Sequence, residues 1–316
     1  MTGYLLRRLA AALSLALAVA TAVFLLLRLV PGDVVTVMLG EADPAPEKVA
    51  AVRHALGLDR PLLWQYGHWL GRAVRGDFGE AFISGRPISP DLAARIPRSL
   101  ELGGVALALA VLAGLPLGAL SARHPGSRLD LAVGGIAVLG LTLPSFVIGM
   151  LFVLLFGLVL HWFPATGFVG FGEDPMGHLR HLVLPSVTLA LTIMPVVMRM
   201  TRASMLEVLH QEYVRTARSK GLAEPVVLTR HVLRNSLIPV ITVIGLQAGT
   251  LLGRIVLIEY IFNWPGLSSL LLTGVNQRDY PLVQAVVLVI ALAFVLINLL
   301  VDVAYGMVDP RIRVAS

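Results

Sequence analysis

The amino-acid sequence predicts an all-α membrane protein with six transmembrane helices. Of its 316 residues, 57% are hydrophobic and only 14% are charged, whereas soluble domains hold about 45–50% apolar and about 25% charged residues. The formal net charge is +6, but the charged residues lie in short segments between long apolar runs, which is typical of membrane loops rather than of a nucleic-acid-binding surface. The chain has no cysteine, and this excludes disulfides and thiolate metal sites.

Six apolar segments are long enough to cross a bilayer, since a helix needs roughly 20 residues to do so. The third is long enough to tilt, and Pro144 is a candidate kink within it. The fourth contains Pro185 and Pro195, which neighbouring helices must compensate. The predicted spans cover residues 9–30, 99–121, 131–160, 182–203, 236–259 and 282–304.

The first segment follows Arg7 and Arg8 and so resembles a secretory signal peptide. Its apolar run extends over residues 9–27, which is longer than the roughly 7–15 residues of a signal sequence. It also continues past the small residues at which cleavage would occur. We therefore expect a retained transmembrane helix over residues 1–30.

Basic residues in short loops indicate that both chain ends lie inside the cell. Short loops on the opposite side hold only Arg180 and Arg278. We therefore predict an N-in, C-in topology, with a cytoplasmic tail at 305–316. The basic residues on the inner side are Arg7, Arg8, Arg123, Arg128, Arg199, Arg202, Arg215, Arg218, Lys220, Arg230, Arg234, Arg311 and Arg313.

Residues 31–98 form a long external insert between the first two spans. Long loops are largely exempt from the charge rule, so the mixed charge of this one does not contradict the topology. Apolar spacing predicts helices over 45–58 and 61–76, and the aromatic residues of the second, such as Trp64 and Trp69, suit a membrane interface. The insert is either a helical lid packed on its own protein or a docking surface for an external partner.

The sequence contains no motif for a reaction of its own. The two lysines, Lys48 and Lys220, do not fit the Walker A pattern for ATP binding. Glu101, Glu259 and Asp302 lie near the ends of predicted spans, whereas proton-coupled carriers place such groups deep in the membrane. The spans therefore look like a passive gate that another molecule drives, and we predict that the chain is not an enzyme.

Two histidines, His178 and His181, are spaced to share one face of a helix. They could belong to a metal site, although no cysteine or dense carboxylate set accompanies them. A pair of interfacial helix-end histidines is the favoured interpretation, and we assign no metal site.

The polar segment 204–235, here called the elbow, is unusual in so apolar a chain. Its first part, residues 205–219, has a helical pattern with Met205, Tyr213 and Ala217 near one stripe. Gly221 is placed to end that helix in a positive-φ conformation, and Pro225 to begin the next. The elbow could lie on anionic lipid, but a structured turn favours insertion into the cleft of a partner protein.

This segment resembles the coupling loop of ATP-binding-cassette (ABC) importer permeases, whose pattern is E-A-A-x-x-x-G. Anchored on Gly221, the triplet is Arg215, Thr216 and Ala217, so Arg and Thr replace the first Glu and Ala. The version "RTARSKG" is similar to the dipeptide, oligopeptide and nickel permeases. Other matching stretches cover almost the whole chain: "LRLVPGD" (27–33), "LGLDRPLLWQY" (56–66), "RGDFG" (75–79), "LTLPSF" (141–146), "LRNSLIPVIT" (233–242), "IEYIFNWPGL" (258–267), "RDYP" (278–281) and "VDPRIR" (308–313).

The resemblance implies a type I ABC importer permease fold in the inner membrane, with residues 99–304 as the core domain. It implies partners as well: a second homologous permease in a heterodimer, two cytoplasmic ATPases that bind ATP and Mg, and an external solute-binding protein. This chain would then need no cofactor. Coupling to the ATPase would involve Glu212, Arg215, Thr216, Ala217 and Gly221.

The cargo stays open at this point. Peptides are the first expectation, and nickel, a metal chelate or another small solute is the alternative. An ATP-independent channel or carrier and a non-transporting scaffold are hypotheses of different classes, which the elbow disfavours.

One departure from the family lies in the fifth span, where Arg254 follows Gly253 in place of a small residue. An arginine in or near a span usually faces the protein interior or a wet cavity. Arg254 could line the external mouth and meet a substrate carboxylate, with Glu259 as a poorly aligned partner, or it could simply snorkel to the interface.

Overall fold

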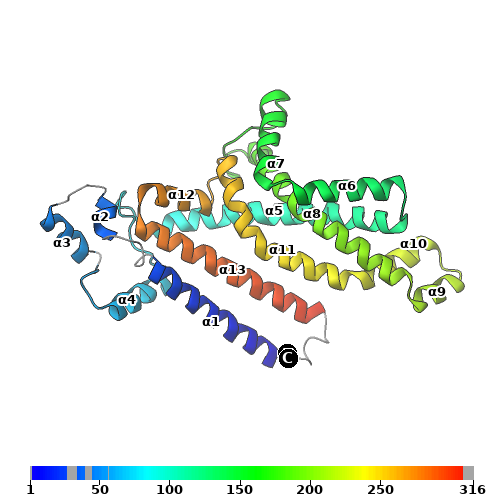
Figure 1. Ribbon diagram of the computed structural model, residues 1–316, viewed down its shortest axis with the longest axis horizontal. Helices are drawn as coiled ribbons and strands as arrows, with labels where there is room; N and C mark the ends of the chain where they lie inside the picture. The colour runs from blue at the N-terminus through cyan, green and yellow to red at the C-terminus, as the bar shows by residue number, and fades with distance from the viewer. Residues whose placement is uncertain (1, 27–33, 40–44, 56, 309–316) are drawn as a thin grey trace. The chain divides into compact units, whose positions relative to one another are not determined.

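The computed structural model describes residues 2–26, 34–39, 45–55 and 57–308. The "LRLVPGD" stretch, the end of the predicted first span and the tail beyond residue 308 lie outside the described residues. The helices are α1 (Thr2–Leu26), α2 (Val34–Leu39), α3 (Pro46–Ala55), α4 (Leu62–Val74), α5 (Ile88–Arg123), α6 (Arg128–Thr142), α7 (Ser145–Phe152), the π-helix η1 (Val153–Val159), α8 (Pro175–Leu209), α9 (Glu212–Ser219), α10 (Glu224–Val226), the π-helix η2 (Val227–Leu233), α11 (Arg234–Ile261), α12 (Leu267–Gln277) and α13 (Tyr280–Val308) (Figure 1).

The predicted all-α membrane fold is confirmed. Five helices of the described chain are long and apolar enough to cross a membrane, and a bent pair provides a sixth crossing if it is counted as one span. These five are α1, α5, α8, the helix that begins at Glu224, and α13. The helices α3 and α4 also lie where the sequence predicted them in the insert.

The third span differs from the single tilted helix that was expected over 131–160. It consists of α6 and the α7–η1 pair, which meet at an angle of 104°. The break falls at Leu143 and Pro144, both with extended backbone angles (ψ 126° and 141°). Proline lacks an amide hydrogen and disfavours the helical conformation of the residue before it. Pro144 therefore ends one helix, a stronger effect than the predicted kink.

Two further helical segments extend beyond the sequence prediction. α5 begins at Ile88, eleven residues before the expected start of the second span, because Ile88 and Leu92 form one buried stripe, each 1% exposed. α12 occupies a stretch that was expected to be a loop, and it ends at Arg278 in a left-handed conformation (φ 56°). Neither segment alone is long enough to cross a membrane, so the lengths of the apolar runs did not indicate either one.

The described chain forms two compact units. The first contains residues 100–264 and segments at the two chain ends, and the second contains residues 6–99 and 265–296. In the first unit α8 contacts α6, α7 and α11, and its buried residues include Leu189, Ile193 and Val197. α8 is therefore the central helix of the first unit.

Glycines allow α5 and α6 to approach α8 closely. A Cβ atom on Gly118 of α5 would lie 2.5 Å from the Met198 carbonyl oxygen, and one on Gly114 would lie 3.0 Å from Val197 Cβ. On α6, a Cβ on Gly140 would lie 2.7 Å from the Leu191 carbonyl oxygen. Small residues four apart are a common device of packed membrane helices, because the attraction there comes from close contact.

Two prolines lie inside α8, and α6 packs closely against one of them. Pro195 has no amide hydrogen, so the Leu191 carbonyl, four residues earlier, loses its usual helical donor. Gly140 of α6 packs against α8 at this point, where an added Cβ would be 2.6 Å from Pro195 Cγ. Pro185 is likewise inside α8 and buried. At Pro195 the neighbouring helix is α6, which packs against the proline ring through Gly140.

The first turns of α8 contain a buried histidine that links two helices. His178 is 2% exposed; its Nδ1 lies 2.8 Å from the Val169 carbonyl oxygen and its Nε2 lies 2.8 Å from Glu101 Oε1. A carbonyl oxygen only accepts, so Nδ1 donates to Val169, and the contact of Nε2 joins the imidazole to the Glu101 carboxyl group. His178 thus ties α8 to α5, and His181 bonds separately to the Gly177 carbonyl.

The second unit joins α1, α4 and the start of α13, and Figure 1 shows α1 beside the first turns of α13. Phe24 of α1 packs edge-on against Tyr66 of α4, with ring centroids 5.1 Å apart, and Thr21 shares a hydrogen bond of 2.8 Å with the Tyr66 hydroxyl. Trp69 also contacts Phe24, whereas Trp64 is 49% exposed. Tyr66 and Trp69 therefore support the lid interpretation of α4.

The Gly118 contact generates a prediction about stability. Gly118→Val should lower the free energy of unfolding by about 1–3 kcal/mol, because the added side chain forces α5 away from α8. The control is Gly104→Val on the same helix, where an added Cβ meets nothing within 4 Å. Thermal unfolding of the two purified variants in detergent measures the difference, and equal melting temperatures would contradict the packing argument.

Candidate functional site

The elbow is a helix–turn–helix that begins where α8 ends. α8 stops at Leu209 and α9 begins at Glu212, after the extended residue Gln211 (ψ 144°). The helix expected to run unbroken over 205–219 is therefore two helices. The break changes the helical phase, so Val214 is buried while Tyr213, which the predicted stripe included, is 43% exposed.

Gly221 ends α9 in the conformation that the sequence predicted. Its φ is +78°, and its amide donates to the Arg218 carbonyl at 2.9 Å, while the Leu222 amide donates to the Ala217 carbonyl at 3.4 Å. This pair of bonds is a Schellman motif, in which a residue with positive φ follows the helix. An added Cβ would meet nothing within 4 Å, so the requirement for glycine comes from the backbone alone.

A hydrophobic cluster, here called the elbow base, fixes the elbow to the first unit. From α9 it contains Val214 and Ala217, which are 0% and 6% exposed. The other buried members come from α5, α8 and η2: Ala122, Met205, Val227, Leu228 and Val232. Burial of such apolar side chains contributes roughly 1.5–3 kcal/mol each for the larger ones. The elbow base therefore makes the turn part of the helical core rather than a free loop.

Ion pairs shape the outer face of the elbow. Arg218 donates two hydrogen bonds, of 3.2 and 2.8 Å, to the Glu224 carboxylate, and this carboxylate raises the pKa of Arg218. The pair joins α9 to α10 across the Gly221 turn. Arg215 pairs with Glu212 at 3.0 Å, but both side chains are mostly exposed (71% and 85%), so that pair contributes little to stability.

The five predicted coupling residues divide into two groups. Glu212, Arg215, Thr216 and Gly221 are exposed on α9 and the turn, whereas Ala217 is buried in the elbow base. Val214 and the Arg218–Glu224 pair were not predicted from the sequence. The spacing of Val214 and Ala217, three residues apart, was a signal for the first, and opposite charges on both sides of Gly221 were a signal for the second.

The two residues predicted for the substrate pathway lie on α11. The Arg254 guanidinium donates to the carbonyl and hydroxyl oxygens of Thr192 on α8, at 3.2 and 3.3 Å. Glu259 is fully buried. The hydrogen bonds of Arg254 thus connect α11 with α8 close to Pro195. The sequence did not indicate this contact.

Comparison with known families accounts for nearly the whole chain. Residues 114–314 match the family described as binding-protein-dependent transport system inner membrane component. Residues 1–102 match the corresponding N-terminal family of such membrane components. The first match alone covers more than half of the sequence.

Relatives of this chain are similar to it over their full length. A protein of Brucella abortus named as a peptide transport system permease is 42% identical over 313 residues, which is 99% of each chain. The glutathione transport system permease of Salmonella choleraesuis is 41% identical over 314 residues, again 99% of each chain. These names describe the relatives.

Two solved structures share the fold. A MetNI methionine ABC transporter in inward-facing conformations matches with a TM-score of 0.58 and 16% identity, over 69% of this chain and 96% of the other. An amino acid ABC transporter matches with a TM-score of 0.51 and 16% identity, over 71% and 94%. Together with the family matches, the helical fold and the elbow identify this chain as a multi-pass inner-membrane permease component of a binding-protein-dependent ABC importer.

Proposed function

We propose that this permease imports short peptides, as one half of a pathway shared with a second, homologous permease. A solute-binding protein would deliver the cargo, and two cytoplasmic ATPases, which bind ATP and Mg, would drive the cycle. The peptide and glutathione names of the relatives support peptides over nickel or a metal chelate. Family membership also disfavours an ATP-independent channel or carrier.

The observation that carries the coupling role is the attachment of the elbow to the core. Val214 and Ala217 are buried against α5, α8 and η2, while Glu212, Arg215 and Thr216 face outward. A force applied to the exposed face would therefore reach α8 without being absorbed by a flexible loop. We infer that this face docks on an ATPase, with Gly221 fixing the turn between α9 and α10.

The proposed topology follows from the distribution of basic residues. The elbow at 204–235 and the tail at 305–316 belong on the cytoplasmic side, and the insert at 31–98 belongs outside. The core domain at 99–304 would then carry the gate. The charges of Arg218, Lys220 and Arg230 support this placement of the elbow.

Arg254 remains our candidate for the substrate pathway, together with Glu259. Arg254 is only partly buried, and its contact with Thr192 holds the guanidinium at the side of α8. A cation held in this way could meet a peptide carboxylate. The competing possibility is that Arg254 has a structural role only: it links α11 to α8 and does not contact the substrate.

Uptake by reconstituted vesicles tests the proposed function. Proteoliposomes that contain this chain, its partner permease and both ATPases should accumulate a labelled peptide when ATP and the binding protein are present. Vesicles that contain this chain alone should not accumulate it. Accumulation by the chain alone would contradict the proposal, because the pathway would then need no separate motor.

Substitution of Gly221 tests the coupling role. Gly221→Val should place a β-branched residue at positive φ, at a cost of roughly 1 kcal/mol or more, and so distort the turn. The complete complex should insert normally and hydrolyse ATP, but its uptake per ATP should fall several-fold. Gly221→Asn should retain most uptake, since asparagine tolerates this conformation.

Gly85→Val is the matched control for Gly221. Gly85 also has positive φ (63°) and open space around its Cβ position, but it lies in the insert. Equal loss of coupling in both variants, or normal uptake by Gly221→Val, would remove the proposed role of Gly221.

Arg254→Gln distinguishes the two roles of Arg254. If the guanidinium meets a substrate carboxylate, KM for a peptide with a free C-terminus should rise about tenfold, the loss expected for a charged hydrogen bond. KM for the amidated peptide should not change. If Arg254 has a structural role only, Arg254→Gln should lower the melting temperature and leave both KM values unchanged.

A further inference from the structure

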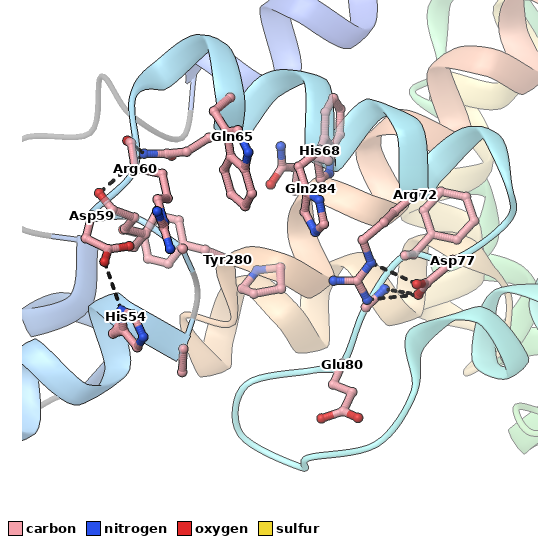
Figure 2. A pocket seen from close by; sticks show the side chains of 18 residues that line it. His54, Asp59, Arg60, Gln65, His68, Arg72, Asp77, Glu80, Tyr280 and Gln284 are labelled. Atoms are coloured by element: carbon pink, nitrogen blue, oxygen red, sulfur yellow. Dashed lines mark hydrogen bonds and ion pairs between the residues drawn. The ribbon is translucent and has the colours of Figure 1, made fainter.

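A cavity in the second unit has the size and polarity of a small-ligand site. Its volume is about 410 Å³, and it lies among the end of α3, the segment 57–60, α4, the segment 77–80 and the start of α13 (Figure 2). Ligand pockets range over about 300–1,000 Å³, so this one suits a molecule of two or three amino-acid residues. The walls combine aromatic rings, such as Trp64 and Tyr280, with charged and amide groups.

Two of the lining carboxylates already have partners. Asp77 accepts two hydrogen bonds from Arg72, of 2.8 and 3.1 Å, and this guanidinium lowers the pKa of Asp77. Asp59 pairs with His54 Nδ1 at 2.9 Å, and that hydrogen bond lowers the pKa of Asp59. These pairs fix the walls of the cavity.

Two hydrogen-bond donors of the cavity have no acceptor among the described residues. The Arg60 guanidinium lies over the Trp64 ring, 5.7 Å from its centroid, and makes no hydrogen bond within the described chain. The Gln284 Nε2 atom is buried and equally without an acceptor there. A buried donor without a partner costs about 1–3 kcal/mol, so an oxygen atom of a ligand would remove that cost at Gln284 Nε2. Arg60 is exposed and carries no such cost.

The backbone around Arg60 is held in place. Gln65 is 9% exposed, and its Nε2 donates to the Arg60 carbonyl at 2.7 Å and to the Leu58 carbonyl at 3.3 Å. The segment before α4 therefore presents Arg60 from a fixed position. Such preorganisation lowers the entropy lost when a ligand binds.

A negative group lines a different side of the cavity. Glu80 has an exposed carboxylate that accepts no hydrogen bond from a described residue. Figure 2 shows Arg60 and Asp59 on one side and Arg72 and Asp77 on the other, with Gln65, His68 and Gln284 labelled between them, and Glu80 below them with its carboxylate turned downward. The cavity thus offers a cation at one end, a buried amide donor in its wall and an exposed carboxylate at its edge.

We propose that this cavity binds a di- or tripeptide in its zwitterionic form. The terminal carboxylate accepts from Arg60, and a peptide carbonyl accepts from Gln284 Nε2. The exposed Glu80 side chain rotates toward the cavity and accepts from the terminal ammonium. The choice of a peptide over another zwitterion of this size rests on the proposed function. The permease itself would then hold cargo in its insert, at a site separate from Arg254.

Equilibrium dialysis tests this site without any transport. The purified full chain in lipid nanodiscs is dialysed against radiolabelled trialanine, or against N-acetyl-trialanine amide, which has the same backbone and no end charges. Trialanine should bind saturably at one site per chain, and the blocked peptide should bind at least about tenfold more weakly, because it lacks the charged hydrogen bonds.

Variants assign the binding to the cavity. Arg60→Gln and Gln284→Leu should each weaken trialanine binding, the first by about tenfold or more. Arg86→Gln, an exposed arginine of the same insert that does not line the cavity, should bind like the parent chain. Thermal unfolding checks that each variant is folded. The comparison of trialanine with the blocked peptide is made on the parent chain, so it does not depend on the folding of any variant.

Three results would overturn the proposal: no saturable trialanine binding, equal binding of the blocked peptide, or unchanged affinity in both cavity variants. None of these three results would contradict the proposed function, because ATP-driven uptake is measured separately on the complete complex. Conversely, trialanine binding by a chain whose complex does not import peptides would refute the proposed cargo and leave the site intact.

Discussion

The structure of the first unit depends on the burial of α8 on nearly all sides. In its most apolar window 72% of the residues are buried, compared with 17–33% in the other candidate spans. Lipid is as apolar as a leucine side chain, so membrane helices associate through close contact rather than through the hydrophobic effect. Gly114, Gly118 and Gly140 supply that contact, and the hydrogen bond of His178 to Glu101 adds a polar tie at the first turns of the helix.

The elbow continues this arrangement beyond the end of α8. Its base contains residues of α5, α8, α9 and η2, so the turn is attached to the same helices that pack in the core. The Schellman motif at Gly221 and the bidentate Arg218–Glu224 pair fix the angle between α9 and α10. A transport pathway that separate ATPases drive needs a rigid segment that transmits their motion to the membrane helices. The attachment of the elbow to the core provides this rigidity, and in this way the fold supports the proposed function.

The sequence was most informative where one residue type has one physical consequence. The apolar runs predicted the spans, and Gly221 predicted a positive-φ helix end, because glycine alone adopts it without strain. The sequence was less informative where tertiary contacts decide. Proline alone does not distinguish a kink from a full break, since Pro144 ends a helix while Pro185 and Pro195 lie inside α8. The buried Val214 depends on packing partners from other helices. The Arg254–Thr192 contact joins residues 62 positions apart, and the cavity around Arg60 needs α4 and α13 to meet, so no local pattern could indicate either.

The rigidity of the elbow relative to α8 is the claim that a direct measurement can settle. The chain has no cysteine, so cysteines introduced at Arg199 on α8 and Arg215 on α9 would carry the only spin labels on this subunit. Electron paramagnetic resonance distances in the complete complex should give one narrow distribution that is the same with and without ATP. A broad distribution, or a distance that shifts when ATP binds, would show that the elbow moves independently of α8 and would contradict the account.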